Sequence, residues 1–556
     1  MRHTITTLLL LAGLLLSVSN GAMGQEPSRD EVLKALRKAA EFYRTKVSTE
    51  GGYHFYYTAD LSYGRSEHEE GFTQVTVQRE GIPSVGLAYL EAYDATGDRY
   101  YLGLARDAAY SLVKGQHCSG GWDYVIEFDP AKRKYYPYRA DGNCGSLPTP
   151  SPGIVRSHPV TNLDDNVSQG AVRLMMRVDR ALGFADAKIH EATLHALDSL
   201  IKAQYPNGAW PQRYREFPDP AKFPVKRASY PETWSKTWPG PNYESEYTFN
   251  DNTISDVIDA FLEASRIYGE PRYQAAAERG GDFILLAQMP EPQPAWAQQY
   301  DADMHPAWAR IFEPPSVTGG ESQGILKTLL VLYRATGKRK YLDAAPRALE
   351  YLQRSALPRA DHPAEARRRM ANGAVVLARF YELRTNKPLY VTKGTRVQVQ
   401  GKSSTLIDGY EISYSDQSVI THYGVLTNGN QLASIADEYK TLAAADVSKM
   451  RRPDKLHGLS PWSGERIVRP KSARAIIDAL DERGAWVEEG NIGKADNVVS
   501  VFAAKDMTLT IGGRVYPVAE NETVSLFQGK QPPPVKVIKS STFSANVNAL
   551  SAWLAK

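Results

Sequence analysis

The sequence predicts a mainly α-helical protein, an α/α toroid of repeated helix pairs with a smaller C-terminal α+β region. The chain has 556 residues, 42% of them hydrophobic, so it can bury a large core and would usually form more than one domain. Apolar segments with helical periodicity recur along the chain, and this recurrence stops near Tyr390, where strand-like alternation begins. These observations separate a repeated helical domain from a region of mixed structure.

The N-terminus carries the features of an export signal. Arg2 precedes an apolar run from Leu8 to Val18, and Ala22-Met23-Gly24 forms a small-x-small cleavage motif before Gln25. The apolar run is shorter than the ~20 residues of a membrane span, and no other stretch approaches that length. We therefore expect a signal peptide over residues 1–24 and a periplasmic or secreted protein without a membrane span.

Four apolar segments mark the starts of successive helix pairs: Val85–Leu90, Gly170–Met175, Val257–Leu262 and Gly324–Leu329. The second helix of each pair ends near a glutamine, and a tryptophan follows the first three of them: Gln116, Gln204, Gln288 and Gln353, then Trp122, Trp210 and Trp296. Such pairs cannot bury their apolar faces alone, so they stack as a solenoid or close into a ring. We expect a toroid over residues 25–393 whose loops line a cleft at one rim.

Residues 394–556 are expected to form an accessory α+β region whose role the sequence does not assign. Thr395–Gln400 alternates as a strand does, and a helix is predicted from Lys471 to Glu482. Val498–Phe502 and Met507–Val515 are strand-like, and Pro532–Pro534 breaks the chain before a final amphipathic stretch.

Charge and cysteine content narrow the possible partners. A net charge of +3 without a long basic run does not suit a nucleic-acid-binding protein. The only cysteines, Cys118 and Cys144, could form a disulfide in an exported protein or remain two free thiols. Only His117 could assist them as a ligand nearby, so a cysteine-based metal site is not expected.

Two clusters of carboxylates and amides stand just before the second and third repeats. They are Asp164-Asp165-Asn166 and Asn250-Asp251-Asn252, and equivalent positions in successive repeats should face the same rim. Their oxygens would suit a hard cation such as calcium. The alternative is ordinary helix capping, although the first and fourth repeats lack a comparable cluster.

Two arginines share an aromatic and acidic setting, because Trp308–Glu313 recurs in similar form as Leu377–Glu382. Arg310 and Arg379 could bind an acidic ligand, or they could simply pair with Glu313 and Glu382 at the rim.

In these stretches the chain resembles the family 10 polysaccharide lyases, pectate lyases with an α/α toroid. The matching segments are Asn207–Gln212, Tyr247–Asn252, Trp308–Pro315, Ala378–Leu383 and Thr385–Asn386. The resemblance covers about residues 30–393 and says nothing about the C-terminal region. It implies cleavage of polygalacturonate (pectate), an acidic polysaccharide, by calcium-assisted β-elimination.

The resemblance also implies roles for individual residues. Arg310 stands where the family has its catalytic arginine base. Asp165 and Asp251 fall at the calcium site, and the expected substrate-binding residues are Asn166, Arg379, Lys393 and Trp210. A tryptophan such as Trp210 is nevertheless a packing residue by default.

Several features depart from the family pattern. Val167 replaces a glycine after the Asp-Asn pair, and Lys393 replaces an arginine, which keeps the charge but loses the bidentate fork. The segment Arg215–Glu246 is an insertion beside the cleft. Two other interpretations stay open: an exported protein that binds uronate glycans without cleaving them, and a triterpene-cyclase-like protein, whose repeat signature Gln116-x-x-x-Gly120-x-Trp122 also fits. The export signal and the lack of an Asp-x-Asp-Asp motif argue against the cyclase.

Overall fold

The computed structural model describes residues 26–67, 71–145, 148, 160–240, 243–358, 374–394, 398–399, 409–414, 426–450, 472–492, 498–502, 508–511, 514–517, 523–527 and 534–556. The predicted signal peptide, residues 1–24, lies outside this part of the chain. None of the helices that are described is long and apolar enough to cross a membrane.

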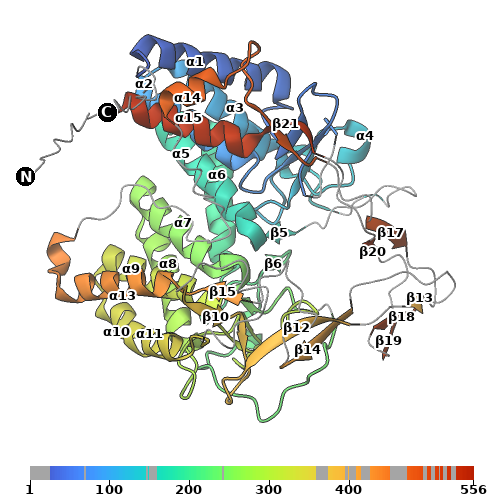
Figure 1. Ribbon diagram of the computed structural model, residues 1–556, viewed down its shortest axis with the longest axis vertical. Coiled ribbons are helices and arrows are strands. Elements are labelled where there is room, and N and C mark those ends of the chain that lie inside the picture. Colours follow the sequence, from blue (N-terminus) through green and yellow to red (C-terminus); the bar gives the residue numbers. More distant parts are fainter. Residues whose placement is uncertain are drawn as a thin grey trace, which may run out of the picture.

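The four predicted helix pairs form a two-layered helical assembly (Figure 1). They are α2 (Ile82–Thr96) with α3 (Arg99–Gly115), α5 (Val167–Ala181) with α6 (Ala187–Lys202), α7 (Thr253–Tyr268) with α8 (Pro271–Ala287), and α9 (Gly319–Thr336) with α10 (Arg339–Asp343) and α11 (Ala345–Arg354). The first helices pack side by side in the order α2, α5, α7, α9 and form the inner layer, in which α5 is buried without a break from Val167 to Asp179. The predicted fold class, a mainly α protein with the repeated helix pairs of an α/α toroid, is confirmed.

The recurring tryptophans and glutamines hold the repeats together. The indole N–H groups of Trp122, Trp210 and Trp296 each donate a 2.8 Å hydrogen bond to a carbonyl of the preceding outer helix. The glutamine amides bridge to the next outer helix, where they donate to the carbonyls of Ala192, Ala276 and Ala344. Because these polar groups are satisfied inside the fold, both residue types have a packing role.

Trp210 is fully buried and stacks on Phe261. Its ring and its N–H group are both used inside the core, so neither is available to a ligand. The expectation that Trp210 binds substrate is therefore wrong, and the default packing interpretation holds for this residue.

Helices from the C-terminal region continue the toroid at both ends. α13 (Gln431–Ala444) packs on α9 and α11, beyond the last predicted pair. α15 (Ser540–Leu554) lies against α2 and against the N-terminal helix α1 (Arg29–Phe42), so the red and blue ends of the chain adjoin (Figure 1). α14 (Ala473–Asp478), within the helix predicted at Lys471–Glu482, contacts both α1 and α15.

The loop after α14 repeats the glycine-tryptophan turn of the earlier pairs. Trp486 donates a 2.8 Å bond to the carbonyl of Ile476, as Trp210 does to that of Leu200. Gly484 has a φ of 99°, close to the 95° of Gly208, and a Cβ atom there would lie 2.6 Å from the Lys38 carbonyl oxygen. Residues 394–556 therefore supply core elements of the toroid in addition to small sheets; the predicted boundary at residue 393 stays a prediction.

Short strands precede the inner helices and fix their N-termini at one rim. The antiparallel pairs at this rim are β3 (Gln74–Thr76) with β4 (Val125–Glu127), β5 (Thr161–Asn162) with β6 (Arg213–Tyr214), β7 (Tyr247–Thr248) with β8 (Gln299–Tyr300), and β10 (Val376–Ala378) with β15 (Leu426–Asn428). A four-stranded sheet has the order β14 (Gly409–Ser413), β12 (Pro388–Gly394), β11 (Phe380–Tyr381), β9 (Val317–Thr318).

The remaining strands join the chain ends and the C-terminal region. A second four-stranded sheet has the order β16 (Val487–Gly490), β21 (Val535–Lys539), β1 (Tyr56–Thr58), β2 (Gly64–Arg65). The predicted strand Val498–Phe502 is β17, paired with β20 (Thr523–Phe527), and Met507–Val515 contains the hairpin of β18 (Thr508–Ile511) and β19 (Arg514–Pro517). Of the predicted strand Thr395–Gln400, β13 (Gln398–Val399) is described.

Cys118 and Cys144 form a disulfide with a Cα–Cα distance of 5.4 Å. The bond joins the loop after α3 to residues that follow the short helix α4 (Pro130–Arg133). Of the two possibilities left open by the sequence, the disulfide is the one formed.

Candidate active site

Two turns at the rim hold consecutive residues in the left-handed backbone region. Asp165 and Asn166 have φ values of 49° and 59°, and Asp251 and Asn252 have 47° and 60°. Such conformations cost about 1–3 kcal/mol each outside glycine and concentrate at functional sites. Neither Asn166 nor Asn252 makes a side-chain capping bond to the helix that it precedes. The helix-capping interpretation therefore fails at both turns.

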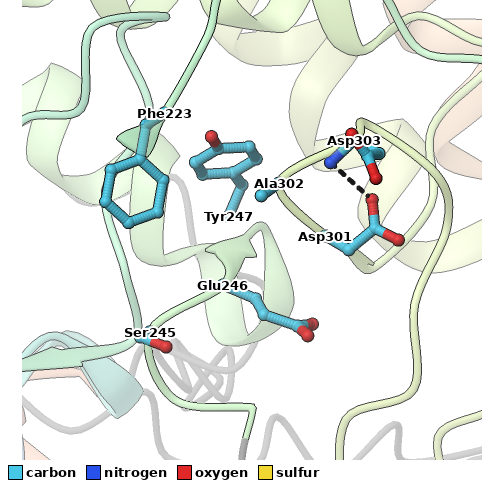
Figure 2. Close-up of a pocket in the computed structure, with 7 residues that line it drawn as sticks. All are labelled: Phe223, Ser245, Glu246, Tyr247, Asp301, Ala302 and Asp303. Carbon is cyan, nitrogen blue, oxygen red and sulfur yellow. Dashed lines mark hydrogen bonds between the residues drawn. The ribbon is translucent and has the colours of Figure 1, made fainter. Parts of the chain in front are cut away.

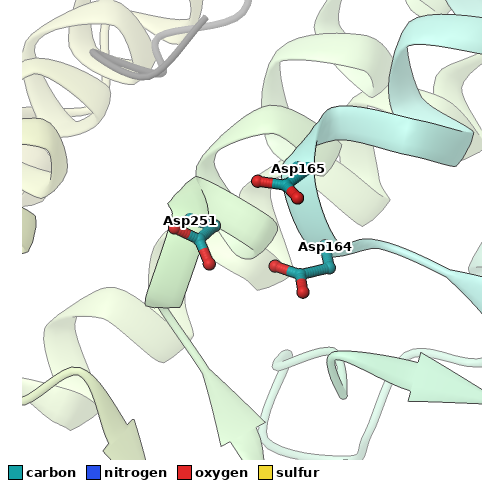
Figure 3. Close-up of side chains that lie close together, drawn as sticks. All are labelled: Asp164, Asp165 and Asp251. Carbon is teal, nitrogen blue, oxygen red and sulfur yellow. The ribbon is translucent and has the colours of Figure 1, made fainter. Parts of the chain in front are cut away.

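These turns bring three carboxylates together at the N-termini of α5 and α7. One oxygen from each of Asp164, Asp165 and Asp251 lies within 4.8 Å of the others (Figure 3). Burial and the neighbouring Asp164 raise the pKa of Asp165 to about 7, and the same causes raise the pKa of Asp251 well above its ordinary value. The cluster is therefore costly to ionise without a positive partner.

Two oxygen atoms at the cluster lack a donor among the described residues. Asp164 Oδ1 and Asn166 Oδ1 are both buried and accept no hydrogen bond there. Orphaned buried acceptors are rare because each carries a desolvation penalty. Carboxylate and amide oxygens gathered in this way are the donor set that calcium prefers, so the residues fit such an ion.

Neighbouring side chains that come from other repeats orient the carboxylates of the cluster. Tyr124, after the first tryptophan, donates from its hydroxyl to Asp165 at 3.0 Å, and Gln78 donates its amide to Asp165 at the same distance. Arg213 Nη2 lies 4.0 Å from Asp164 Oδ2, and its Nη1 atom is 2.7 Å from Glu244.

Arg310 adjoins the cluster on the side of the third repeat. Its Nη2 atom lies 3.1 Å from Asp251 Oδ2, and its Nε and Nη2 atoms donate to Glu313 at 2.9 and 2.8 Å. Burial alone would lower the pKa of Arg310, but the carboxylates of Glu313 and Asp251 outweigh burial and raise it. The predicted salt bridge to Glu313 exists, and it accompanies a contact with the acidic cluster.

Arg379 occupies a different position from Arg310, despite the similar sequence around the two arginines. Its carbonyl accepts from the N–H of Gly319 at the start of α9, as the carbonyl of Gln298 accepts from that of Phe249 before α7. Arg379 thus occupies the position equivalent to Gln298, which follows Trp296 by two residues. Arg310 instead lies in the longer loop after β8. The buried guanidinium of Arg379 is 3.2 Å from Glu321, while Glu382 pairs with Lys236.

The structure thus unites Asp165, Asn166, Asp251 and Arg310 at one rim. Lys393 lies in β12 opposite Tyr410, and its side chain is outside the described part of the structure. Sequence reasoning missed three neighbours of the cluster: Tyr124, Gln78 and Arg213. One sequence signal could have found Tyr124, namely the position two residues after each repeat tryptophan. Tyr124, Gln212 and Gln298 hold this position, and Arg379 holds the equivalent position two residues after Leu377.

A separate cavity of about 320 Å³ lies beside β7 (Figure 2). It is lined by Phe223, Ser245, Glu246, Tyr247, Asp301, Ala302 and Asp303. Burial raises the pKa of Glu246 to about 7, although Gln299 donates to its carboxylate at 2.6 Å. The cavity does not include the aspartate cluster.

Comparison with known proteins finds a family match in the segment that carries the cluster. The family described as Pectic acid lyase matches residues 160–402. No match was found among curated proteins.

Similar solved structures include a mutant family 10 polysaccharide lyase from Cellvibrio cellulosa in complex with trigalacturonic acid. It is 18% identical, with a TM-score of 0.41, over 65% of this chain and 98% of that chain. Another family 10 polysaccharide lyase structure from Cellvibrio cellulosa is 19% identical, with a TM-score of 0.39, over 63% of this chain and 97% of that chain. A cellobiose 2-epimerase from Bacillus thermoamylovorans is 12% identical, with a TM-score of 0.36, over 59% of this chain and 72% of that chain. Over residues 160–402, which hold the aspartate cluster, Arg310 and Arg379, the chain is similar to the family described as Pectic acid lyase.

Proposed function

We propose that the protein is an exported pectate lyase that cleaves polygalacturonate by calcium-assisted β-elimination. The observation that carries the proposal is the cluster of Asp164, Asp165 and Asp251, with its orphaned oxygens, next to the guanidinium of Arg310. The family match supports polysaccharide-lyase chemistry in general. Polygalacturonate, calcium and export are the specific parts of the proposal.

In β-elimination, a base removes the proton at C5 of a uronate, and the bond from C4 to the glycosidic oxygen breaks. The electron pair from C5 forms a double bond between C4 and C5, and the departing oxygen takes a proton. The carboxylate at C5 carries negative charge into the enolate-like transition state, so fixed positive charge there lowers the barrier. Arg310, whose guanidinium contacts Asp251 of the cluster, is a cationic side chain that can supply it.

Calcium would be held by Asp164, Asp165 and Asp251, with the Asn166 amide oxygen as a further donor. When bound, it would polarise the uronate carboxylate and so acidify the C5 proton. Held in left-handed turns at two helix N-termini, these side chains need little rearrangement to converge on one ion.

The charge state of Arg310 constrains its role. Glu313 and Asp251 favour the protonated guanidinium, which can bind the uronate carboxylate and stabilise the enolate. The family resemblance implies that Arg310 acts as the base, and a base must be deprotonated. These carboxylates would therefore have to stop favouring the protonated guanidinium while substrate is bound. We assign Arg310 to the reacting centre and Asn166, Arg379 and Lys393 to substrate binding.

The test is an ultraviolet assay of the mature protein with polygalacturonate and calcium. The 4,5-unsaturated product absorbs, so absorbance should rise with wild-type protein. Arg310→Ala should lower the rate by at least about 100-fold. Arg339→Ala, which removes an exposed guanidinium from α10, is the matched control and should keep wild-type activity.

Other uronate polymers in the same assay define substrate preference. Binding of polygalacturonate without any gain in absorbance would contradict the lyase proposal and favour a non-catalytic glycan-binding protein.

A further inference from the structure

The insertion noted at Arg215–Glu246 contains an extended segment that crosses the rim beside Arg310. Residues 231–238, which we call the strap, lie between residues 308–313, the arginine loop, and the sheet that contains β11 and β12. The strap contacts both elements through side chains and through its backbone.

Two reciprocal indole hydrogen bonds join the strap to the arginine loop. Trp238 Nε1 of the strap donates to the carbonyl of Ala309 at 2.8 Å. Trp308 Nε1 of the loop donates in the opposite direction, to the carbonyl of Ser235 at 2.9 Å. These bonds end on the two residues that precede Arg310, so they fix the backbone from which its side chain extends.

The other side of the strap is anchored to the sheet. Trp234 packs with Phe312 against an apolar cluster of Phe380, Leu389, Tyr390 and Val391. Lys236 pairs with Glu382, and Arg384 donates to the carbonyl of Pro231 at 2.9 Å. Because the strap is held at both sides, it can transmit the rigidity of the sheet to the arginine loop.

We propose that the strap positions Arg310, and that Trp238 and Trp308 are positioning residues for the reacting guanidinium. Glu313 fixes the guanidinium from within the loop, whereas the strap fixes the loop against the rest of the rim. A loop shifted by about 1 Å can cost about 100-fold in rate although every reacting group is present. The catalytic part of this inference rests on the proposed lyase function.

The experiment compares Trp238→Phe and Trp308→Phe with a matched control at Tyr230, the residue that precedes the strap. Each of the two variants keeps an aromatic ring and loses one indole donor. The control, Tyr230→Phe, also loses one donor to a backbone carbonyl, that of Pro290, which lies outside the arginine loop. Full-length proteins are compared by thermal unfolding, hydrogen exchange of the peptide covering residues 308–313, and steady-state kinetics on polygalacturonate with calcium.

We expect both tryptophan variants to speed exchange in the arginine loop about fivefold, the factor for losing one net hydrogen bond. We also expect kcat to fall at least about tenfold while KM changes less than about threefold. Tyr230→Phe should leave exchange in the loop and kcat at wild-type values. A merely structural role would lower the unfolding temperature equally in all three variants without this selective loss of kcat.

Unchanged exchange in both tryptophan variants would overturn the inference. Faster exchange with unchanged kcat would overturn the positioning role. If the wild-type protein cleaved no uronate polymer, the proposed function and the catalytic role of the strap would both fail, whereas hydrogen exchange would still show whether the strap holds the loop.

Discussion

The side chain of Glu313 largely determines the charge and direction of Arg310. It is buried, it accepts both Nε and Nη2 of the guanidinium, and it accepts the Arg310 backbone N–H at 2.8 Å. The amide of Gln298 donates to the same carboxylate at 2.8 Å, which fixes its orientation. The arginine therefore points at Asp251 as part of a preorganised group, and bound substrate need not order a free side chain.

Glu246, in the cavity beside β7, predicts a measurable pH dependence of stability. Burial raises its pKa to about 7 in the folded protein, above the value of about 4.3 expected in the unfolded chain. Between these values the folded state holds a proton that the unfolded state has lost, so this group lowers stability as pH rises to about 7. Glu246→Gln can keep the bond from Gln299 and removes the ionisation.

Glu246→Gln should therefore raise the melting temperature relative to wild type more at pH ~8 than at pH ~5. Scanning calorimetry at both pH values measures the difference. Glu350→Gln, at an exposed position of α11, is the control and should show no such dependence. An equal shift for Glu246→Gln at both pH values would contradict the burial argument.

At the residue scale, sequence reasoning found the acidic cluster and Arg310, and through the family resemblance it assigned Arg310 and Arg379 to different tasks. The similar phrases around Arg310 and Arg379, taken alone, would place the two residues in equivalent positions. The backbone register instead aligns Arg379 with Gln298, because each lies two residues after the repeat tryptophan or its equivalent. Side-chain similarity over six residues is weaker evidence than a position counted from a buried landmark such as Trp296.

At the scale of elements, α5 and α7 are joined by a buried ionic brace below the aspartate cluster. Arg173 Nη2 lies 2.7 Å from Asp259, its Nε atom lies 3.1 Å from Glu263, and Arg177 also pairs with Glu263. Since the aspartate turns stand at the N-termini of these two helices, the brace helps to set the separation of Asp165 and Asp251.

Removal of one partner would leave buried charge uncompensated. Arg173→Met should therefore lower the free energy of unfolding by about 3–5 kcal/mol, measured by urea denaturation. Arg339→Met removes an exposed pair with Asp343 and should cost no more than about 1 kcal/mol. Equal effects of the two substitutions would show that the brace does not stabilise the helix pair.

The helix pairs themselves were predictable, because their apolar periodicity and their glutamine and tryptophan positions are local properties of the sequence. The strap was not, since its course depends on contacts between residues 231–238 and segments 70 or more residues away, such as the bond from Trp238 to Ala309. The left-handed turns at Asp165 and Asp251 were also invisible, because aspartate and asparagine before a helix usually indicate capping.

At the scale of the whole molecule, the C-terminal region completes the helical domain. Phe543 of α15 stacks on Tyr43 with ring centroids 3.7 Å apart and meets Tyr89 of α2 edge-on. The sequence offered one signal for this arrangement, since Gly484-Ala485-Trp486 copies Gly208-Ala209-Trp210. A contact between residues about 500 positions apart cannot be inferred from periodicity alone.

This packing predicts that residues 25–393 will not fold on their own. A chain truncated after residue 393 should aggregate or unfold without a cooperative thermal transition, because the faces of α1 and α2 that α15 covers would be exposed. Phe543→Ala in the full chain should cost about 3–5 kcal/mol, measured by urea denaturation. A monomeric fragment with the melting temperature of the full chain would contradict the role assigned to α15.

The central claim is that the aspartate cluster and Arg310 form a cation-assisted lyase site. The most direct test is the initial rate of unsaturated product formation from polygalacturonate, measured against calcium concentration for wild-type protein and Asp251→Asn. Wild-type activity should saturate with calcium and vanish with a strong chelator, and Asp251→Asn should need at least about tenfold more calcium. Equal rates of product formation in chelator and in calcium, with no change in Asp251→Asn, would contradict the claim.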